Sequence, residues 1–157
     1  MDRHIHGLPW GNGSASIAAD VTKPAFSRDH GMTGSSPDTA AAQRRVLIVE
    51  DEMLIGMLLE DMLGDLGIKV IGVIPRVNEA LAAVQREGFD LAILDVHLNG
   101  QAVFPVADVL IERGIPFVFA TGYGERGLPE KYRGRPILQK PFAKEDLAKV
   151  IEQIGGG

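Results

Sequence analysis

Four short apolar runs in this chain are each followed by residues that can handle phosphate or a divalent cation. These residues are, in chain order, Glu50 with Asp51, then Asp95, Thr121 and Lys140. A parallel α/β sheet places ligands at the carboxyl ends of its strands, so residues that follow separate strands can meet at one edge. The sequence therefore predicts one site that gathers carboxylates, a hydroxyl group and an ammonium group.

The carboxylates of Glu50, Asp51 and Asp95 predict a metal site. Like charges packed closely raise one another's pKa and repel unless a cation lies among them. Mg²⁺ suits such a site because it binds through one or two carboxylates, keeps several waters and also takes phosphate oxygens. Two simpler interpretations remain open at this point: residues 50–52 can be an acidic first turn that complements a helix dipole, and Asp95 can cap a loop.

A carboxylate that attacks phosphorus needs neutralisation of the transferring charge, a donor to the phosphoryl oxygens and a bridging metal. Asp95 can supply the nucleophile, Thr121 the donor and Lys140 the positive charge. Lys140 alone would be interpreted as a surface charge, but Pro141 stiffens the turn that aims it and allows a cis Lys140–Pro141 bond. The combination predicts phosphoryl transfer to Asp95.

The spacing of apolar residues predicts strands that alternate with helices. We expect the strands at residues 46–49, 68–74, 91–94, 116–120 and 137–139. We expect the helices at 54–66, from an Asn78 cap to Gly88, at 103–111 and around 147–154. This alternation predicts an α/β fold, a doubly wound parallel sheet of five strands in a single domain.

The segment between the fourth and fifth predicted strands interrupts the alternation of strands and helices. Within thirteen residues it contains Gly122, Gly124, Gly127, Pro129 and Gly134. Gly and Pro disfavour helix interiors by roughly 1 and 3 kcal/mol, respectively. We therefore predict a short, frayed or absent fourth helix.

The composition excludes several classes of protein. The 157 residues are 45% apolar and include no cysteine, which predicts one ordinary globular core, no disulfide framework and a cytoplasmic protein. No stretch approaches the roughly 18 apolar residues of a membrane span, and the first residues lack the apolar region of a secretory signal. We expect no membrane association.

The net charge of −5 belongs entirely to residues 45–157, because the acidic and basic residues of 1–44 balance. We expect no direct nucleic-acid contact, since that affinity rests on neutralising phosphates with Lys and Arg. Residues 1–44 show neither helical nor strand periodicity, which predicts a disordered N-terminal extension before a domain at 45–157. Met32 is an alternative start, which would make residues 1–31 an addition to the native chain.

Four segments together resemble the CheY-like receiver domains of bacterial two-component response regulators: VLIVEDE (46–52), DLAILDVHLN (90–99), FATG (119–122) and QKPF (139–142). The resemblance covers residues 45–154 and implies a flavodoxin-like sheet with strand order 2-1-3-4-5. It also implies that Asp95 is the phosphoryl acceptor, that the Thr121 hydroxyl holds the phosphoryl group and that Lys140 pairs with it. The implied Mg²⁺ ligands are Asp51, Asp95 and the backbone carbonyl of His97, with Glu50 in support.

Two positions depart from the commonest receiver pattern. Ile137 stands where many receivers carry an aromatic switch residue, and an aliphatic side chain cannot make that rotamer change. Residues 119–123 and their Gly-rich continuation resemble the FAT GUY receivers of alphaproteobacteria, whose usual second aromatic stands where this chain has Gly124. We therefore predict that acylphosphate formation at Asp95 reorganises residues 121–135.

Three other interpretations use some of the same residues. Residues 122–127 fit the G-x-G-x-x-G spelling of dinucleotide-binding proteins. That fingerprint opens a long helix after the first strand, whereas here it follows the fourth predicted strand and runs into Leu128 and Pro129. An aspartyl-phosphate hydrolase would typically carry a second acid where this chain has His97. A degenerate receiver, acting as a phosphorylation-independent binding module, would usually lack one of Asp51, Asp95, Thr121 and Lys140.

The resemblance implies a stand-alone receiver that takes its phosphoryl group from a sensor histidine kinase, of the HWE or a related type, or from a phosphotransfer protein. Such a receiver catalyses its own aspartyl phosphorylation and dephosphorylation and acts on no external substrate. We expect it to signal by protein contact or phosphorelay, as a monomer or weak dimer.

Overall fold

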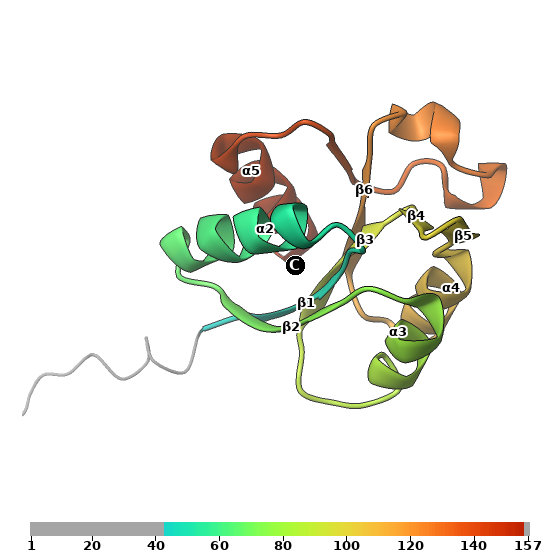
Figure 1. The fold of residues 1–157 in the computed structure, drawn as a ribbon, viewed down its shortest axis with the longest axis horizontal. Coiled ribbons are helices and arrows are strands. Elements are labelled where there is room, and N and C mark those ends of the chain that lie inside the picture. The colour runs from blue at the N-terminus through green and yellow to red at the C-terminus, as the bar shows by residue number, and fades with distance from the viewer. Residues whose placement is uncertain (1–42, 156–157) are drawn as a thin grey trace, which may run out of the picture. The chain divides into compact units, whose positions relative to one another are not determined.

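A parallel sheet of five strands lies at the centre of the described part of the chain, residues 43–155 of this computed structural model (Figure 1). The strands are β1 (Arg45–Val49), β2 (Lys69–Ile74), β3 (Leu91–Asp95), β6 (Phe117–Thr121) and β7 (Ile137–Gln139). They pair in parallel in the order β2-β1-β3-β6-β7. Counted among these five strands, the order is 2-1-3-4-5, which confirms the predicted flavodoxin-like sheet.

The extension predicted at residues 1–44 lies outside the described residues, apart from Gln43 and Arg44, so its disorder stays a prediction. Within residues 43–155, no helix is long and apolar enough to cross a bilayer.

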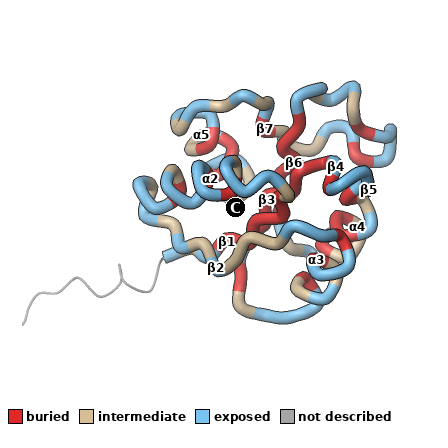
Figure 2. The backbone as a smooth tube through the Cα atoms, in the orientation of Figure 1, coloured by how far each residue is buried: buried red, intermediate tan, exposed pale blue. Residues whose placement is uncertain are grey.

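Both faces of the sheet are covered by helices (Figure 1). α2 (Met53–Asp65) and α5 (Lys144–Gly155) pack on one face, and α3 (Val77–Ala83) and α4 (Phe104–Arg113) pack on the other. Figure 2 shows buried strands between helices whose outer surfaces are exposed. This double cover explains why the inner strands read as uninterrupted apolar runs.

Alternate residues of the central strands enter two separate cores. Leu94 and Phe119 belong to the core of α3 and α4, whereas Ile93 and Val118 belong to the core of α2 and α5. Asp95 continues β3 and is itself buried. The Asp95 side chain therefore lies at the carboxyl edge of the sheet, next to the apolar core.

α3 begins before the predicted Asn78 cap and ends before Gly88. Its first helical residue is Val77, and Arg76, which precedes it, has an extended backbone and makes no side-chain cap. Val77 is buried against the sheet, so packing rather than a cap fixes the first turn. The Val84 N–H still makes a helical bond to the Ala80 carbonyl at 2.9 Å, and the next two N–H groups make i→i−3 bonds, such as the one from Arg86 to the Ala83 carbonyl at 3.1 Å.

The connection between β6 and β7 contains two short 3₁₀ turns, η3 (Gly124–Gly127) and η4 (Glu130–Tyr132), in place of an α-helix. This confirms the predicted irregular fourth helix. Leu128 and Tyr132 anchor the second half of the connection in the core of α3 and α4. In the first half, residues 122–127, no side chain is buried.

A small hairpin between β3 and α4 was not predicted. It consists of β4 (His97–Leu98) and β5 (Gln101–Ala102), which pair antiparallel. Asn99 and Gly100 form its turn with positive φ angles of 50° and 81°. Asn-Gly is the dipeptide that favours such two-residue turns, and it was the available signal, because strands this short show no alternation.

Candidate functional site

Three carboxylates meet at the carboxyl edge of the sheet. β1 and β3 are neighbours with Val49 opposite Leu94, so Glu50, which follows β1, is level with Asp95, the last residue of β3. Glu50, Asp51 and Asp95 each offer a carboxylate oxygen, and these atoms all lie within 4.8 Å of one another. Like charges at this spacing repel strongly unless a cation balances them.

Lys140 places its ammonium group against two of these carboxylates. It follows β7, its backbone N–H donates to the Thr121 carbonyl at 2.9 Å, and a cis bond joins it to Pro141. Lys140 Nζ lies 3.2 Å from Glu50 Oε1 and 3.5 Å from Asp95 Oδ1. The ammonium group therefore offsets part of the repulsion among the acids.

Glu50 is the most deeply buried of the acids, with a side chain only 1% exposed. Burial raises the pKa of Glu50 to about 7. The Glu52 backbone N–H, which donates to Glu50 Oε2 at 3.1 Å, opposes this rise in pKa, Asp95 adds to it, and Lys140 opposes it. Near neutral pH the protonation of this carboxyl group is therefore sensitive to any further charge in the site.

Lys140 remains a cation despite its partial burial. Burial by itself lowers the pKa of the ammonium group, but the negative charges of Asp95 and Glu50 outweigh burial and raise the pKa above its usual value. The site thus keeps a fixed positive charge beside Asp95.

Backbone N–H groups of the β4–β5 hairpin hold the other two carboxylates. The Asn99 N–H donates to Asp51 Oδ2 at 2.9 Å, and the His97 N–H donates to Asp95 Oδ1 at 3.4 Å. Within residues 43–155, the Asp51 side chain accepts a hydrogen bond through Oδ2 and none through Oδ1. The role of the His97 carbonyl as a metal ligand stays a prediction.

Thr121 reaches the same edge from β6. It follows Ala120, which pairs with Asp95 across the sheet. The Thr121 side chain is buried, and its Oγ1 accepts the Tyr123 N–H at 3.1 Å. Because Oγ1 is the acceptor in this bond, the hydroxyl proton can still be donated to a ligand.

The donor set at this edge fits Mg²⁺. Small hard cations favour carboxylate oxygens and retained water, and Glu50, Asp51 and Asp95 offer oxygens within 4.8 Å of one another. Lys140 already balances part of their charge, so a single divalent ion is enough to complete the neutralisation. The geometry therefore agrees with the predicted metal site.

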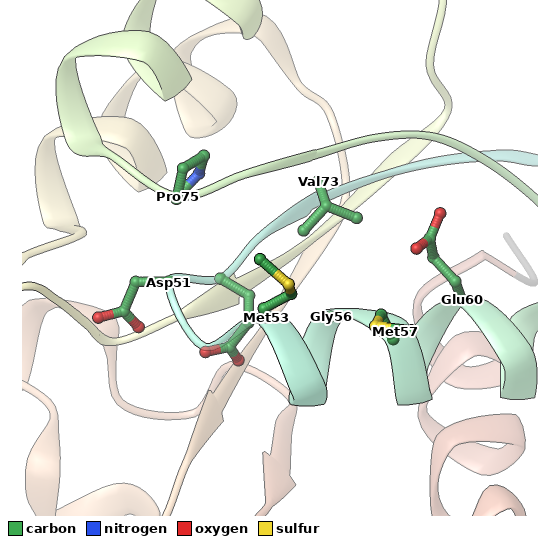
Figure 3. A pocket seen from close by; sticks show the side chains of 8 residues that line it. Asp51, Met53, Gly56, Met57, Glu60, Val73 and Pro75 are labelled. Atoms are coloured by element: carbon green, nitrogen blue, oxygen red, sulfur yellow. The ribbon is translucent and has the colours of Figure 1, made fainter.

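An apolar cleft of about 230 Å³ opens beside the acidic cluster, between α2 and the end of β2 (Figure 3). In Figure 3, Met53 and Met57 lie on α2 across from Val73, and Asp51 and Glu60 lie toward opposite ends. The residues that line the cleft are Glu50, Asp51, Met53, Gly56, Met57, Glu60, Val73 and Pro75.

The first half of α2 exposes apolar side chains that the sequence alone did not mark as exposed. Met53, Leu54, Met57 and Leu58 are between 45% and 79% exposed. Helical periodicity identified the apolar positions but not which of them the sheet would cover. The apolar band of α2 is therefore wider than its buried face, which includes Leu59 and Leu63.

Comparisons with known proteins agree with this fold. The family model described as the response regulator receiver domain matches residues 46–152. The chain is 36% identical over 126 residues to the transcriptional regulatory protein PdtaR of Mycobacterium tuberculosis, a match that takes 77% of this chain and 62% of PdtaR. The chain thus spans less than two thirds of the length of that relative.

Two solved structures of SdrG resemble the chain more closely. SdrG from Sphingomonas melonis Fr1 is 46% identical, with a TM-score of 0.66 over 72% of this chain and 97% of SdrG. The BeF₃-activated conformation of SdrG from Pseudomonas melonis Fr1 is 48% identical, with a TM-score of 0.61 over 68% of this chain and 92% of the SdrG chain. The likeness therefore extends over nearly the whole of the SdrG chains.

Proposed function

The chain belongs to the response regulator receiver domain family, and from this premise we propose that it accepts a phosphoryl group on Asp95. The observation that carries the proposal is the contact between Lys140 Nζ and Asp95 Oδ1, 3.5 Å long, within the cluster of acids. In this proposal the protein is cytoplasmic, and the donor is a phosphohistidine on a sensor histidine kinase, of the HWE or a related type, or on a phosphotransfer protein. The phosphorylated domain signals by protein contact or phosphorelay.

In the proposed step, a carboxylate oxygen of Asp95 attacks the phosphorus of the phosphohistidine. The P–N bond breaks as the P–O bond to Asp95 forms, and the imidazole leaves with the electron pair of the broken bond. Attack by water on the acylphosphate later releases inorganic phosphate and restores the carboxylate. The protein thereby completes a cycle on its own side chain.

Lys140 and Thr121 stabilise the phosphoryl group in this proposal. The Lys140 ammonium group exchanges its contact with Asp95 for one with a phosphoryl oxygen, and the Thr121 hydroxyl donates to another oxygen. The bond of 2.9 Å from the Lys140 N–H to the Thr121 carbonyl couples the ends of β6 and β7. The two phosphoryl contacts are therefore positioned together.

Asp51, Asp95 and the His97 carbonyl would hold Mg²⁺, with Glu50 in support. When bound, the ion supplies positive charge to the oxygens of the transferring group. The chain's own contribution is to keep the carboxylates fixed before the donor arrives, through Lys140 and the hairpin N–H groups.

Phosphorylation reorganises the connection between β6 and β7, within residues 121–135. When the Thr121 hydroxyl turns toward the phosphoryl group, its bond with the Tyr123 N–H is disturbed. Residues 122–127 contain no buried side chain, so few contacts oppose a rearrangement. The BeF₃-activated conformation solved for SdrG supports a test with this phosphoryl mimic. Identical amide spectra of residues 121–135 with and without BeF₃⁻ would contradict the reorganisation.

The phosphodonor docks on the exposed apolar face of α2. Met53, Leu54, Met57 and Leu58 form this face, and α2 begins two residues after Asp51. A contiguous apolar surface of this kind is typical of interaction sites. Acidic residues lie at both ends of the adjoining cleft, so a donor helix with apolar and basic side chains complements it (Figure 3).

Intact mass measurement after incubation with Mg²⁺ and acetyl phosphate tests the proposed acceptor. We expect the wild type to gain one phosphoryl group and Asp95→Asn to gain none. Asp61→Asn, which changes an exposed aspartate on α2, is the matched control and should keep the gain. No gain in the wild type would instead favour a degenerate receiver that acts as a phosphorylation-independent binding module.

A further inference from the structure

We propose that Asn99 is a positioning residue for Asp51, through the left-handed turn that it forms with Gly100. The inference rests on the proposed function, in which Asp51 is a metal ligand. It concerns which oxygen of that ligand faces the cation and what keeps it there.

The contact that carries the proposal is made by the backbone of the turn. The Asn99 N–H donates to Asp51 Oδ2 at 2.9 Å, although 48 residues separate the two in the chain. A carboxylate that accepts a backbone N–H is held in one rotamer by a charge-assisted bond. Oδ2 already accepts from the turn, and no hydrogen bond within residues 43–155 uses Oδ1 of Asp51, so we assign Oδ1 to the cation.

The Asn99 side chain fixes the turn from its other side. Asn99 Nδ2 donates to the Pro75 carbonyl at 3.3 Å, which joins the hairpin tip to the end of β2. The next carbonyl back along that strand, of Ile74, accepts the Glu50 N–H at 2.9 Å. The ends of β1 and β2 and the hairpin tip are therefore linked in a closed ring of hydrogen bonds around Asp51.

The base of the hairpin is equally well fixed. The side chain of Leu98 is fully buried, and the Val103 N–H donates to the Val96 carbonyl at 3.0 Å. The tip therefore cannot drift away from Asp51 without disturbing the core. Through its N–H, Asn99 therefore restrains the Asp51 carboxylate, which is only half-buried.

The residue type at position 99 follows from the backbone. Asn99 has a φ of 50°, a conformation that Asn and Gly tolerate and β-branched residues strongly disfavour. Gly at this position would keep the N–H in place but lose the bond to Pro75. Val would shift the backbone and move the N–H away from Asp51. The two substitutions thus separate the two contacts.

Mg²⁺ affinity measured by calorimetry on the unphosphorylated protein tests the proposal. Partners that orient a metal ligand are typically worth 10- to 100-fold in affinity, so Asn99→Val should weaken binding about 10-fold. Asn99→Gly should stay within about 3-fold of the wild type, because it keeps the N–H that orients the ligand. At saturating Mg²⁺, Asn99→Val should regain most of its phosphorylation rate with acetyl phosphate.

A matched control separates positioning from general strain. Gly67, at the far end of α2, has a φ of 77° and open space around it, so Gly67→Val strains the backbone without touching the site. If Gly67→Val weakens Mg²⁺ binding as much as Asn99→Val does, or if Asn99→Val binds Mg²⁺ like the wild type, the proposal is overturned.

Hydrogen exchange in the metal-free protein gives a second readout. The Asn99 amide should exchange faster in Asp51→Ala than in the wild type, and an unchanged rate would contradict the bond. Both readouts are independent of phosphoryl transfer. If the wild type binds Mg²⁺ but gains no phosphoryl group, the proposed function fails while the role of Asn99 can still be decided.

Discussion

Lys140 Nζ lies 3.5 Å from Asp95 Oδ1, so the proposed nucleophile is paired with a cation before any donor arrives. The same ammonium group contacts the buried Glu50 at 3.2 Å. In the proposed function, Lys140 therefore competes with Mg²⁺ for the same acids and also contacts an oxygen of the phosphoryl group. The first effect weakens Mg²⁺ binding, whereas the second speeds phosphorylation.

Replacing Lys140 with Met should tighten Mg²⁺ binding and slow phosphorylation. The substitution removes a positive charge beside the acids, so we expect affinity for the ion to rise by at least about 3-fold. The rate with acetyl phosphate should fall by about 100-fold, because a contact to the developing charge is lost. Calorimetry and mass-based kinetics measure the two effects, and Lys144→Met, an exposed lysine, is the control. Weaker Mg²⁺ binding in Lys140→Met would show that charge competition does not govern the site.

The stability of the ion-free protein should fall as the pH rises from about 5 to 8. Glu50 has a pKa of about 7 in the folded protein, against an ordinary value of 4.5, so between these values only the folded state keeps the proton. Its contribution to stability is fully present below the unfolded pKa and is lost as the pH rises through the folded pKa. Urea unfolding at both pH values measures this loss. Glu50→Gln should reduce the pH dependence, and an equal slope in that variant would reject the assignment to Glu50.

Tyr132→Phe should destabilise the protein by about 1 kcal/mol at pH 7. The Tyr132 hydroxyl donates to Asp108 Oδ1 at 2.6 Å, and Phe keeps the stacking on Phe104, whose ring centroid lies 4.8 Å away. The hydroxyl is also the main cause of the lowered pKa of Asp108.

The effect of Tyr132→Phe should depend on pH. Because the pKa of Asp108 is lowered in the folded state, its contribution is present above the unfolded pKa and is lost as the pH falls through the folded pKa. The difference between the two proteins should therefore shrink below about pH 4. Chemical unfolding at several pH values measures it, with Tyr123→Phe at an exposed tyrosine as the control. A difference that stays constant at low pH would exclude the bond to Asp108 as its source.

Leu54→Glu should impair transfer from a protein donor but not from acetyl phosphate. Leu54 is 79% exposed on α2, so a charge there costs little stability but opposes docking of an apolar helix. We expect transfer from an autophosphorylated histidine kinase, identified by phosphotransfer profiling, to slow at least about 10-fold. Glu112→Ala on the opposite face of the sheet is the control. Equal loss with both donors would place Leu54 in the chemistry instead of in docking.

The sequence could indicate that the site residues lie close together because each stands at the end of a strand or one or two residues after it. The register that sets Ala120 opposite Asp95 places Thr121 at the same edge, and no detail of side-chain packing is needed to foresee this. The contact between Asn99 and Asp51 could not be foreseen in the same way. It depends on how a hairpin of two-residue strands folds over a neighbouring loop, and such strands are too short to carry a periodic signal.

The burial of α2 shows a second limit of sequence patterns. Leu58 and Leu59 are adjacent and chemically identical, yet Leu58 is 45% exposed and Leu59 is 1% exposed. Hydrophobic spacing locates a helix and its apolar band, but the width of the band that the sheet covers is set by the neighbouring elements.

The connection between β6 and β7 is mostly exposed. From residue 122 to residue 135, only Leu128 and Tyr132 are buried. Gly127 is an exception among the positions that are not buried, because a Cβ there would lie 3.6 Å from Thr121 Oγ1. Substitutions at the exposed positions of this connection should therefore alter the surface of the domain while leaving the buried contacts of Leu128 and Tyr132 in place.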